Sequence, residues 1–127
     1  MAFKANYFVA ATIVAVVATP TVANAASYPN LLKQGYSVGK LGPGKSGNLG
    51  WVLSNGDQKF FCRMNAGVAY AGKKDMVSFT TSGRMIKLDR AVFEASIGGP
   101  DPSIPQLADL KAGRAKPADV GACAALR

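Results

Sequence analysis

The chain contains only two cysteines, Cys62 and Cys123, and this pair constrains its fold more than any other feature. A disulfide between them would close a loop of about 60 residues and remove unfolded-state entropy worth roughly 4 kcal/mol. In an oxidising compartment two such thiols pair rather than stay free. The alternative is a redox-active pair, but that chemistry usually uses a Cys-x-x-Cys spacing. We therefore predict one structural disulfide.

The amino-terminal segment has the pattern of a signal peptide. Lys4 supplies a positive charge, and the run at residues 7–18 that follows carries none. Alanines at positions 23 and 25 stand where a signal peptidase requires small side chains, so cleavage is expected after Ala25. A transmembrane anchor would need roughly 20 apolar residues, and this run is shorter. We expect residues 1–25 to be the signal peptide and residues 26–127 to form one small disulfide-closed domain, periplasmic or secreted.

Positive charge is the main compositional signal. The chain has a formal net charge of +8, and loss of Lys4 with the signal peptide leaves +7. Outside the cytoplasm a cationic surface attracts anionic lipid headgroups, lipopolysaccharide or acidic polymers, and salt screens this attraction. Solubility alone would explain the same charge. Nucleic acid is not an expected partner in this compartment.

One turn signal predicts a β-hairpin. Asn55-Gly56 is typical of a two-residue turn between antiparallel strands, here residues 49–54 and 57–64. The expected register places one apolar face toward the core, with Cys62 on it. Its pairs are Leu53 with Gln58, Trp51 with Phe60, and Leu49 with Cys62.

Ser82-Gly83 predicts a second hairpin between residues 76–81 and 84–88. A two-residue turn there would pair Phe79 with Ile86 and Val77 with Leu88. Further upstream, residues 36–38 are expected to add an edge strand after a short helical segment through Leu31 and Leu32.

Helical signals gather after the strands. Asp89 and Gly98 could cap a short helix, although Val92 and Phe93 between them would also suit a strand. Ser103 could begin another that ends at Gly113, with an apolar stripe at Ile104, Leu107 and Leu110. From Pro117 a short alanine-rich turn or helix is expected to carry Cys123. The class is therefore α+β: a small antiparallel sheet of two hairpins with short C-terminal helices and one disulfide.

The segment from Gly39 to Ser46 matches the phosphate-loop pattern G-x-x-x-x-G-K-[ST]. Such a loop binds phosphates only when a helix follows it, because the helix N-terminus faces the ligand. Here Gly47-Asn48-Leu49 leads into the first predicted strand. We therefore expect a glycine-rich hairpin loop and no nucleotide.

The chain contains no histidine. This removes the usual general base near neutral pH, the Ser-His and Cys-His dyads and the commonest metal ligand. The carboxylates remain, and a pair could hydrolyse a glycosidic bond, but no spacing selects one. We expect no enzyme, no cofactor and no metal, with a carboxylate-dependent hydrolase as the alternative. The candidates for that alternative are Asp57, Asp75, Asp89, Glu94, Asp101, Asp109 and Asp119.

One place in the predicted hairpin combines an aromatic ring with two cations. Phe61 lies on the face opposite the core, flanked by Lys59 and Arg63. We predict that these three residues form a surface for an anionic envelope component or another exported protein. No catalytic residue is assigned.

The chain resembles two groups of exported proteins. Leu-Leu-Lys-Gln-Gly-Tyr near residue 31, Trp-Val-Leu-Ser-Asn-Gly running into Phe-Phe-Cys, and a last cysteine near the end resemble small uncharacterised exported proteins of alphaproteobacteria, which implies export but no activity. The loop from Thr80 to Arg84 is similar to the Ser-Gly-x-Lys/Arg-Tyr loop of periplasmic lysozyme inhibitors. That likeness lacks the Tyr, and a cationic chain would be repelled by the cationic enzyme.

Overall fold

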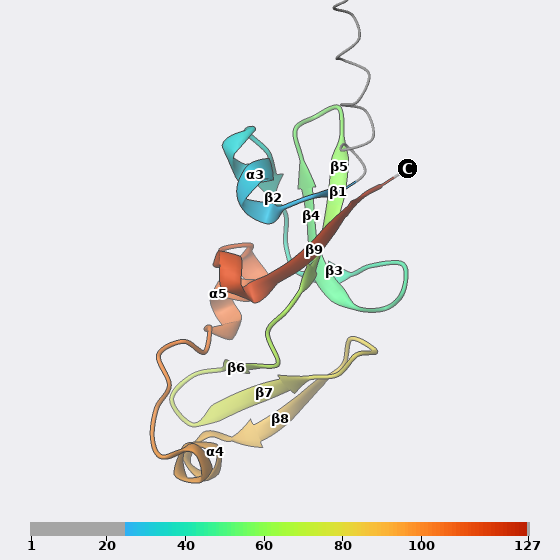
Figure 1. The fold of residues 1–127 in the computed structure, drawn as a ribbon. Coiled ribbons are helices and arrows are strands. Elements are labelled where there is room, and N and C mark those ends of the chain that lie inside the picture. Colours follow the sequence, from blue (N-terminus) through green and yellow to red (C-terminus); the bar gives the residue numbers. More distant parts are fainter. Residues whose placement is uncertain (1–24, 127) are drawn as a thin grey trace, which may run out of the picture.

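Two antiparallel sheets make up the framework of the protein (Figure 1). The structure is a computed structural model that describes residues 25–126. The predicted signal peptide lies outside the described residues, apart from the backbone of Ala25. The α+β class is confirmed, but the two predicted hairpins lie in different sheets.

The first sheet has the strand order β1-β9-β5-β4-β2, and β3 also pairs with β4. All its pairings are antiparallel. Its centre is the hairpin of β4 and β5, in which Trp51, Leu53, Phe60 and Cys62 are buried on one face and the residues between them, more exposed except for Gly50, occupy the other. The strands are β1 (Ala25–Ala26), β2 (Ser37–Val38), β3 (Gly42–Pro43), β4 (Leu49–Ser54), β5 (Lys59–Met64) and β9 (Val120–Ala125).

The second sheet has three strands in the order β6-β7-β8. It follows β5 after a short connection, and in Figure 1 it lies below the first sheet. Its strands are β6 (Val68–Tyr70), β7 (Asp75–Phe79) and β8 (Met85–Asp89).

Between residues 25 and 126, four short helical segments connect the strands. Helix α3 (Tyr28–Lys33) has Ser27 as its N-cap and confirms the helical segment predicted around Leu31. Helix α4 (Arg90–Ile97) is capped by Asp89 and ends at Gly98 in the left-handed conformation, as predicted. Helix α5 (Leu107–Ala112) ends at Gly113, also as predicted, and a 3-10 turn (Pro117–Asp119) precedes β9.

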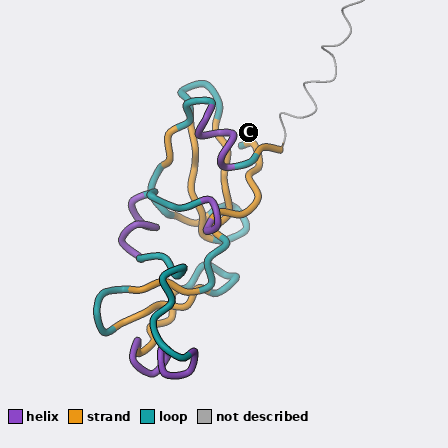
Figure 2. Tube along the Cα trace, turned by 60° about the vertical axis from the view of Figure 1, so that its left-hand side comes forward, coloured by secondary structure: helices purple, strands orange, loops and turns teal. Residues whose placement is uncertain are grey.

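The core lies on the inner face of the first sheet, where α3 and α5 cover it (Figures 1 and 2). The Trp51 side chain is fully buried, and its indole N–H donates to the Leu110 carbonyl oxygen at 2.8 Å. This bond satisfies the one polar group of the indole and fixes α5 against β4. The other large buried members are Tyr28, Leu31, Tyr36, Leu53, Phe60 and Val77.

The predicted disulfide between Cys62 and Cys123 is confirmed. The two residues lie directly opposite each other on β5 and β9, with a Cα–Cα distance of 3.9 Å. The expectation of a turn or helix around Cys123 is wrong, because Cys123 is in the middle of a strand. Alanine is a strong helix former, but helix propensity is a weak preference that tertiary pairing overrides, and here β5 supplies backbone partners for this segment.

The first hairpin turns one residue later than predicted. Its tip is Gly56-Asp57, since the Asn55 N–H donates to the Gln58 carbonyl oxygen, and the Asn55 side-chain oxygen accepts from the N–H groups of residues 57 and 58. Ser54 therefore pairs with Lys59, and Trp51 pairs with Cys62 rather than Phe60. The pairing slips by two residues, so every side chain keeps its predicted face.

The second hairpin slips by one residue, and this changes faces. The Thr80 N–H donates to the Arg84 carbonyl oxygen, so the loop between the strands has three residues, 81–83. Gly83, the last of the three, has a positive φ. Phe79 consequently pairs with Met85, and Ser78 pairs with Ile86. The prediction that Val77, Phe79, Ile86 and Leu88 share one apolar face is wrong. Ile86 and Leu88 lie on the other face of the sheet from Val77 and Phe79.

Helix α5 begins four residues after the predicted cap at Ser103. The Ser103 hydroxyl instead donates to the Asp101 carboxylate at 2.7 Å. Pro105 disfavours helical geometry at Ile104, so the helix cannot begin there. Leu107 and Leu110 nevertheless lie on the helix as predicted, and Leu110 is fully buried.

Candidate functional site

The outer face of the first sheet carries the three residues that the sequence selected. Every second residue of β5 belongs to this group: Lys59, Phe61 and Arg63. Their side chains point away from the core, whereas those of Phe60 and Cys62 point into it. Lys59 and Arg63 are thus separated by four residues, or about 13 Å along the strand. Among the described elements no helix covers this face, because α3 and α5 both lie on the other side of the sheet (Figure 2).

Phe61 is half-buried rather than exposed. A Cβ atom built on Gly44 would lie 2.7 Å from the ring of Phe61, and one on Gly50 would lie 2.6 Å from it. The ring therefore rests on two glycines, one in the turn after β3 and one in β4. The aromatic side chain fixes this turn to the sheet and leaves only part of its surface for a partner.

The segment from Gly39 to Ser46 is placed beside this aromatic ring. It contains β3, and a turn from Gly44 to Asn48 leads into strand β4, as expected from the sequence. Because Gly44 contacts Phe61, the exposed Lys45 that follows lies close to the row on β5. We name Lys45, Lys59, Phe61 and Arg63 the β5 face. No pattern in the sequence connects Lys45 to the other three residues.

The cations of the β5 face have no carboxylate partner among the described residues. The described ion pairs join Lys87 to Asp75, Arg90 to Glu94 and Arg114 to Asp109, all outside this face. Residues 26–64 contain five cations and a single carboxylate, Asp57. This half of the domain therefore presents uncompensated positive charge to solvent.

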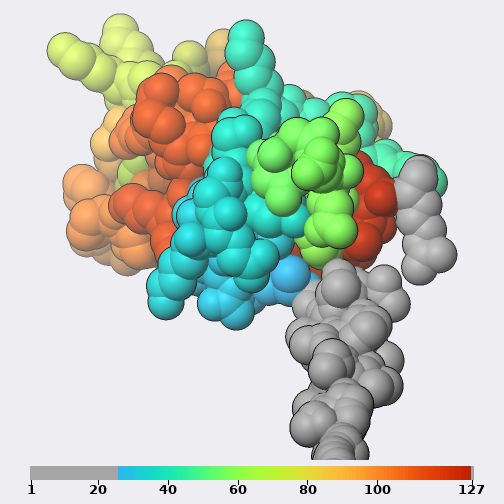
Figure 3. Space-filling model, turned by 90° about the horizontal axis from the view of Figure 1, so that it is seen from above, coloured from blue at the N-terminus to red at the C-terminus, as the bar shows by residue number. Residues whose placement is uncertain are grey.

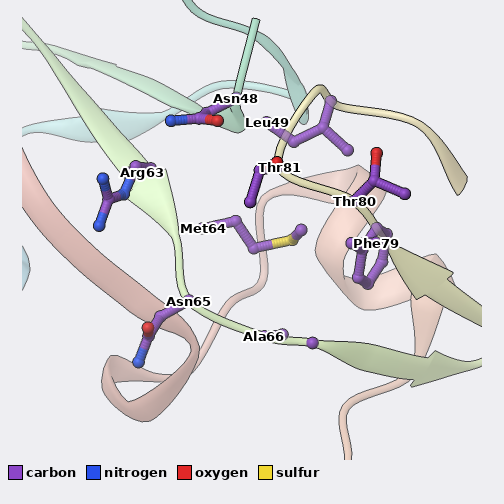
Figure 4. Close-up of a pocket in the computed structure, with 10 residues that line it drawn as sticks. Asn48, Leu49, Arg63, Met64, Asn65, Ala66, Phe79, Thr80 and Thr81 are labelled. Carbon is purple, nitrogen blue, oxygen red and sulfur yellow. The ribbon is translucent and has the colours of Figure 1, made fainter.

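A cleft of about 280 Å³ lies where the two sheets meet (Figure 4). Its apolar part consists of Leu49, Met64 and Phe79, and Figure 4 shows the Met64 side chain directed toward the Phe79 ring. Arg63 and Asn65 extend to the other side of the chain trace, at the rim of the cleft. Asn48, Ala66, Gly67, Thr80 and Thr81 complete the lining.

The cleft was not predicted from the sequence. Its walls come from the end of β5, the turn before β4 and the loop of the second hairpin, which are far apart in the chain. No periodic pattern marks such a meeting of segments. Arg63 is the one residue shared by the cleft and the predicted surface.

The loop from Thr80 to Arg84, which resembles that of lysozyme inhibitors, closes one end of the cleft. The Thr80 hydroxyl oxygen accepts from the Arg84 N–H at 3.0 Å and lies 3.0 Å from the Ser82 hydroxyl. Gly83 approaches so closely that a Cβ atom there would overlap the Gly47 carbonyl oxygen. The loop thus packs backbone to backbone against the turn before β4.

Most carboxylates named for a hydrolase have a structural partner. Asp75, Glu94 and Asp109 are in the ion pairs, and Asp89 caps α4. Hydrogen bonds from Ser103 lower the pKa of the Asp101 carboxyl. Asp57 is exposed near the tip of the first hairpin, and Asp119 is buried before β9.

The described residues contain neither a metal-binding cluster nor a membrane-spanning helix. No cluster of three metal-ligating side chains is present among residues 25–126. No described helix is both long and apolar enough to span a bilayer. Comparison of the chain with protein-family models, curated proteins and solved structures gives no match.

Proposed function

We propose that this protein is an exported, non-enzymatic binding module that attaches to an anionic component of the bacterial envelope. The carrying observation is the β5 face: Lys59 and Arg63 stand on either side of Phe61 along the strand, and no described carboxylate pairs with them. Lys45 follows Gly44, which packs against the Phe61 ring. Cations that no carboxylate neutralises produce a positive potential that attracts negatively charged groups.

The predicted export supports this compartment. Cys62 and Cys123 form a disulfide, and disulfides persist mainly in oxidising compartments. The signal-peptide pattern points to the same route. On this proposal the disulfide stabilises a small domain outside the cytoplasm, where anionic lipids and acidic polymers are abundant partners.

The test is adsorption of the exported, oxidised protein to anionic material. Vesicles of phosphatidylglycerol in phosphatidylcholine and an immobilised acidic polysaccharide serve as two separate probes of the same charge. Each cation near an anionic lipid surface contributes about 1 kcal/mol, so Lys59→Ala with Arg63→Ala should weaken vesicle binding roughly thirtyfold. Added salt should weaken binding of the unaltered protein as well.

The matched control is Lys73→Ala with Lys74→Ala. These two exposed cations lie in the turn between β6 and β7, so the control removes the same charge from a different surface. The proposal requires a much larger loss for the β5 face than for the control. Equal losses would mean that net charge alone drives adsorption, and unchanged binding of both variants to both probes would refute the proposal.

A further inference from the structure

The cleft between the sheets has a chemical character different from that of the β5 face. Its lining has an apolar part, namely Leu49, Met64 and Phe79, and a polar part with amides and hydroxyls. The Arg63 guanidinium stands at its rim, and none of the described carboxylates contributes to the lining. Such a site rejects cations and accepts a small neutral or anionic molecule.

The walls of the cleft are held in place before any ligand arrives. On one side, the bonds of Thr80 to Arg84 and Ser82 hold the hairpin loop. The close approach of Gly83 to Gly47 locks that loop to the first sheet. On the other side, the Phe79 N–H donates to the Gly67 carbonyl oxygen at 2.9 Å. A preformed site loses less conformational entropy on binding than a flexible one.

The free hydrogen-bonding groups select the ligand class. The Thr80 hydroxyl is already hydrogen-bonded within the loop. Three other polar side chains of the lining form no hydrogen bond to a described residue, namely Asn48, Asn65 and Thr81. Two primary amides and a hydroxyl suit a ligand with several hydroxyl groups, and the Phe79 ring suits the apolar face of a sugar ring. The guanidinium of Arg63 can form a bidentate hydrogen bond to one carboxylate. The volume of about 280 Å³ accommodates one such ring.

We propose that this cleft binds a single acidic sugar unit, with the carboxylate on Arg63 at the rim and the ring against Phe79. The inference rests on the proposed function and deepens it, because it names an acidic sugar as the anionic group recognised next to the β5 face. The larger groove beside α4, of about 460 Å³, is mainly apolar and contains no cation, so it offers no comparable selection.

The experiment is an NMR titration of the oxidised, exported protein with glucuronate, glucose and acetate. Glucuronate should shift the backbone amides of Asn48, Asn65 and Thr81. It should bind roughly tenfold more tightly than glucose, the gain expected from one charge-assisted hydrogen bond. Acetate should produce no comparable effect. Shifts spread over the cationic surface, no shifts at the cleft, or equal shifts from acetate would each overturn the proposal.

Two variants test the site independently. Gly67 has no positive φ and no atom within 4 Å of a built Cβ, so Gly67→Leu adds volume at the cleft without backbone strain and should abolish glucuronate binding. Gly42→Leu is the matched control, since Gly42 also has open space but does not line the cleft. Arg63→Met should remove the preference for glucuronate over glucose. Unchanged binding in Gly67→Leu, or an unchanged preference in Arg63→Met, would contradict the assignment.

The outcomes separate this inference from the proposed function. Gly67→Leu leaves Lys45, Lys59 and Arg63 in place and should adsorb to anionic vesicles like the unaltered protein. Lys59→Ala removes a cation of the β5 face but does not touch the cleft, so it should leave glucuronate binding unchanged. If the unaltered protein adsorbs to anionic vesicles but does not bind glucuronate, only the cleft is refuted, and the proposed function stands.

Discussion

Gly50 shows how a single missing side chain permits the packing of the first sheet. It is buried in β4 opposite Arg63, and a Cβ atom there would collide with the Cys62 carbonyl oxygen and the Phe61 ring. Glycine usually weakens a strand, and its presence in the middle of β4 is explained by this close approach.

We predict that Gly50→Ala lowers the free energy of unfolding by about 2 kcal/mol, because the added methyl overpacks the sheet. Urea denaturation of the oxidised protein measures this value. Gly42→Ala is the control, since that glycine has open space around it, and its effect should be much smaller. Equal effects at both positions would mean that the overlap at Gly50 is relieved at no cost.

Asp101 is the carboxylate whose environment is most clearly defined. Its Oδ1 accepts from the Ser103 hydroxyl at 2.7 Å and from the Ser103 N–H at 3.0 Å. These bonds favour the ionised form, so the pKa of Asp101 is lowered.

We predict that Ser103→Ala raises the pKa of the Asp101 carboxyl, as measured by NMR titration of its side-chain carbon. Because folding depresses this pKa, the stabilisation is present above the pKa of the unfolded chain and is lost as the pH falls through the folded pKa. The difference in stability between the two proteins should therefore shrink in acid. A pKa that Ser103→Ala leaves unchanged would contradict the hydrogen-bond assignment.

At the scale of elements, the two hairpins differ in what their turn glycines contact. Gly56 and Gly83 both have a positive φ, but Gly56 has open space around it, while Gly83 touches the Gly47 carbonyl group. Gly56 itself therefore packs against nothing, whereas Gly83 joins the second sheet to the first.

Gly56→Ala should cost about 1 kcal/mol, the strain of a side chain at positive φ. Gly83→Ala should cost clearly more, because it adds the collision with Gly47 and separates the loop from the first sheet. Thermal unfolding of both variants makes this comparison. Similar midpoints would show that the contact between the two loops contributes nothing to stability.

Helix α3 and the tip of the first hairpin lie next to each other when the molecule is viewed from above (Figure 3). The Tyr36 hydroxyl donates to the Gln58 side-chain oxygen at 3.1 Å, and the Tyr36 and Phe60 rings meet edge to face. An aromatic residue after the helix thus anchors α3 and β2 to the central hairpin.

For the whole molecule, the disulfide joins the last strand to the central one. It ties β9 to β5 across a separation of 61 residues, and that interval contains the entire second sheet. Both cysteines are buried in the core of the first sheet.

We predict that Cys62→Ala with Cys123→Ala lowers the free energy of unfolding by about 4 kcal/mol. Small domains have only about 5–15 kcal/mol in total, so the variant should unfold at a far lower urea concentration. Mass spectrometry under non-reducing conditions should find no free thiol in the exported protein. Two alkylatable thiols before reduction would contradict the bridge in the exported form.

Export predicts a defined amino terminus. Cleavage after Ala25 would divide β1, whose two residues pair with Ala124 and Cys123 of β9. Mass analysis should find the exported protein starting at Ala26, and a bulky residue at position 25 should block processing. A full-length chain beginning at Met1 in the envelope fraction would contradict the predicted cleavage.

The alternation of side chains and the turn and cap residues predicted the class, the presence of the two hairpins, both ends of α4 and the end of α5. The presence of two cysteines in a chain with an export signal predicted the disulfide. Asp89, Gly98 and Gly113 act on their own neighbours, so their effect is visible locally. The β5 face followed from the same alternation, which a slip of two residues leaves intact.

Tertiary structure decided everything that depends on a distant partner. Cys123 lies in a strand because β5 has backbone groups to pair, and the second hairpin changes faces because of one additional loop residue. Phe61 is half-buried because Gly44 folds over it, and the cleft exists because Gly83 meets Gly47. Local sequence determines the conformation of a residue, but contacts between segments far apart in the chain determine which surfaces meet, and no local pattern encodes them.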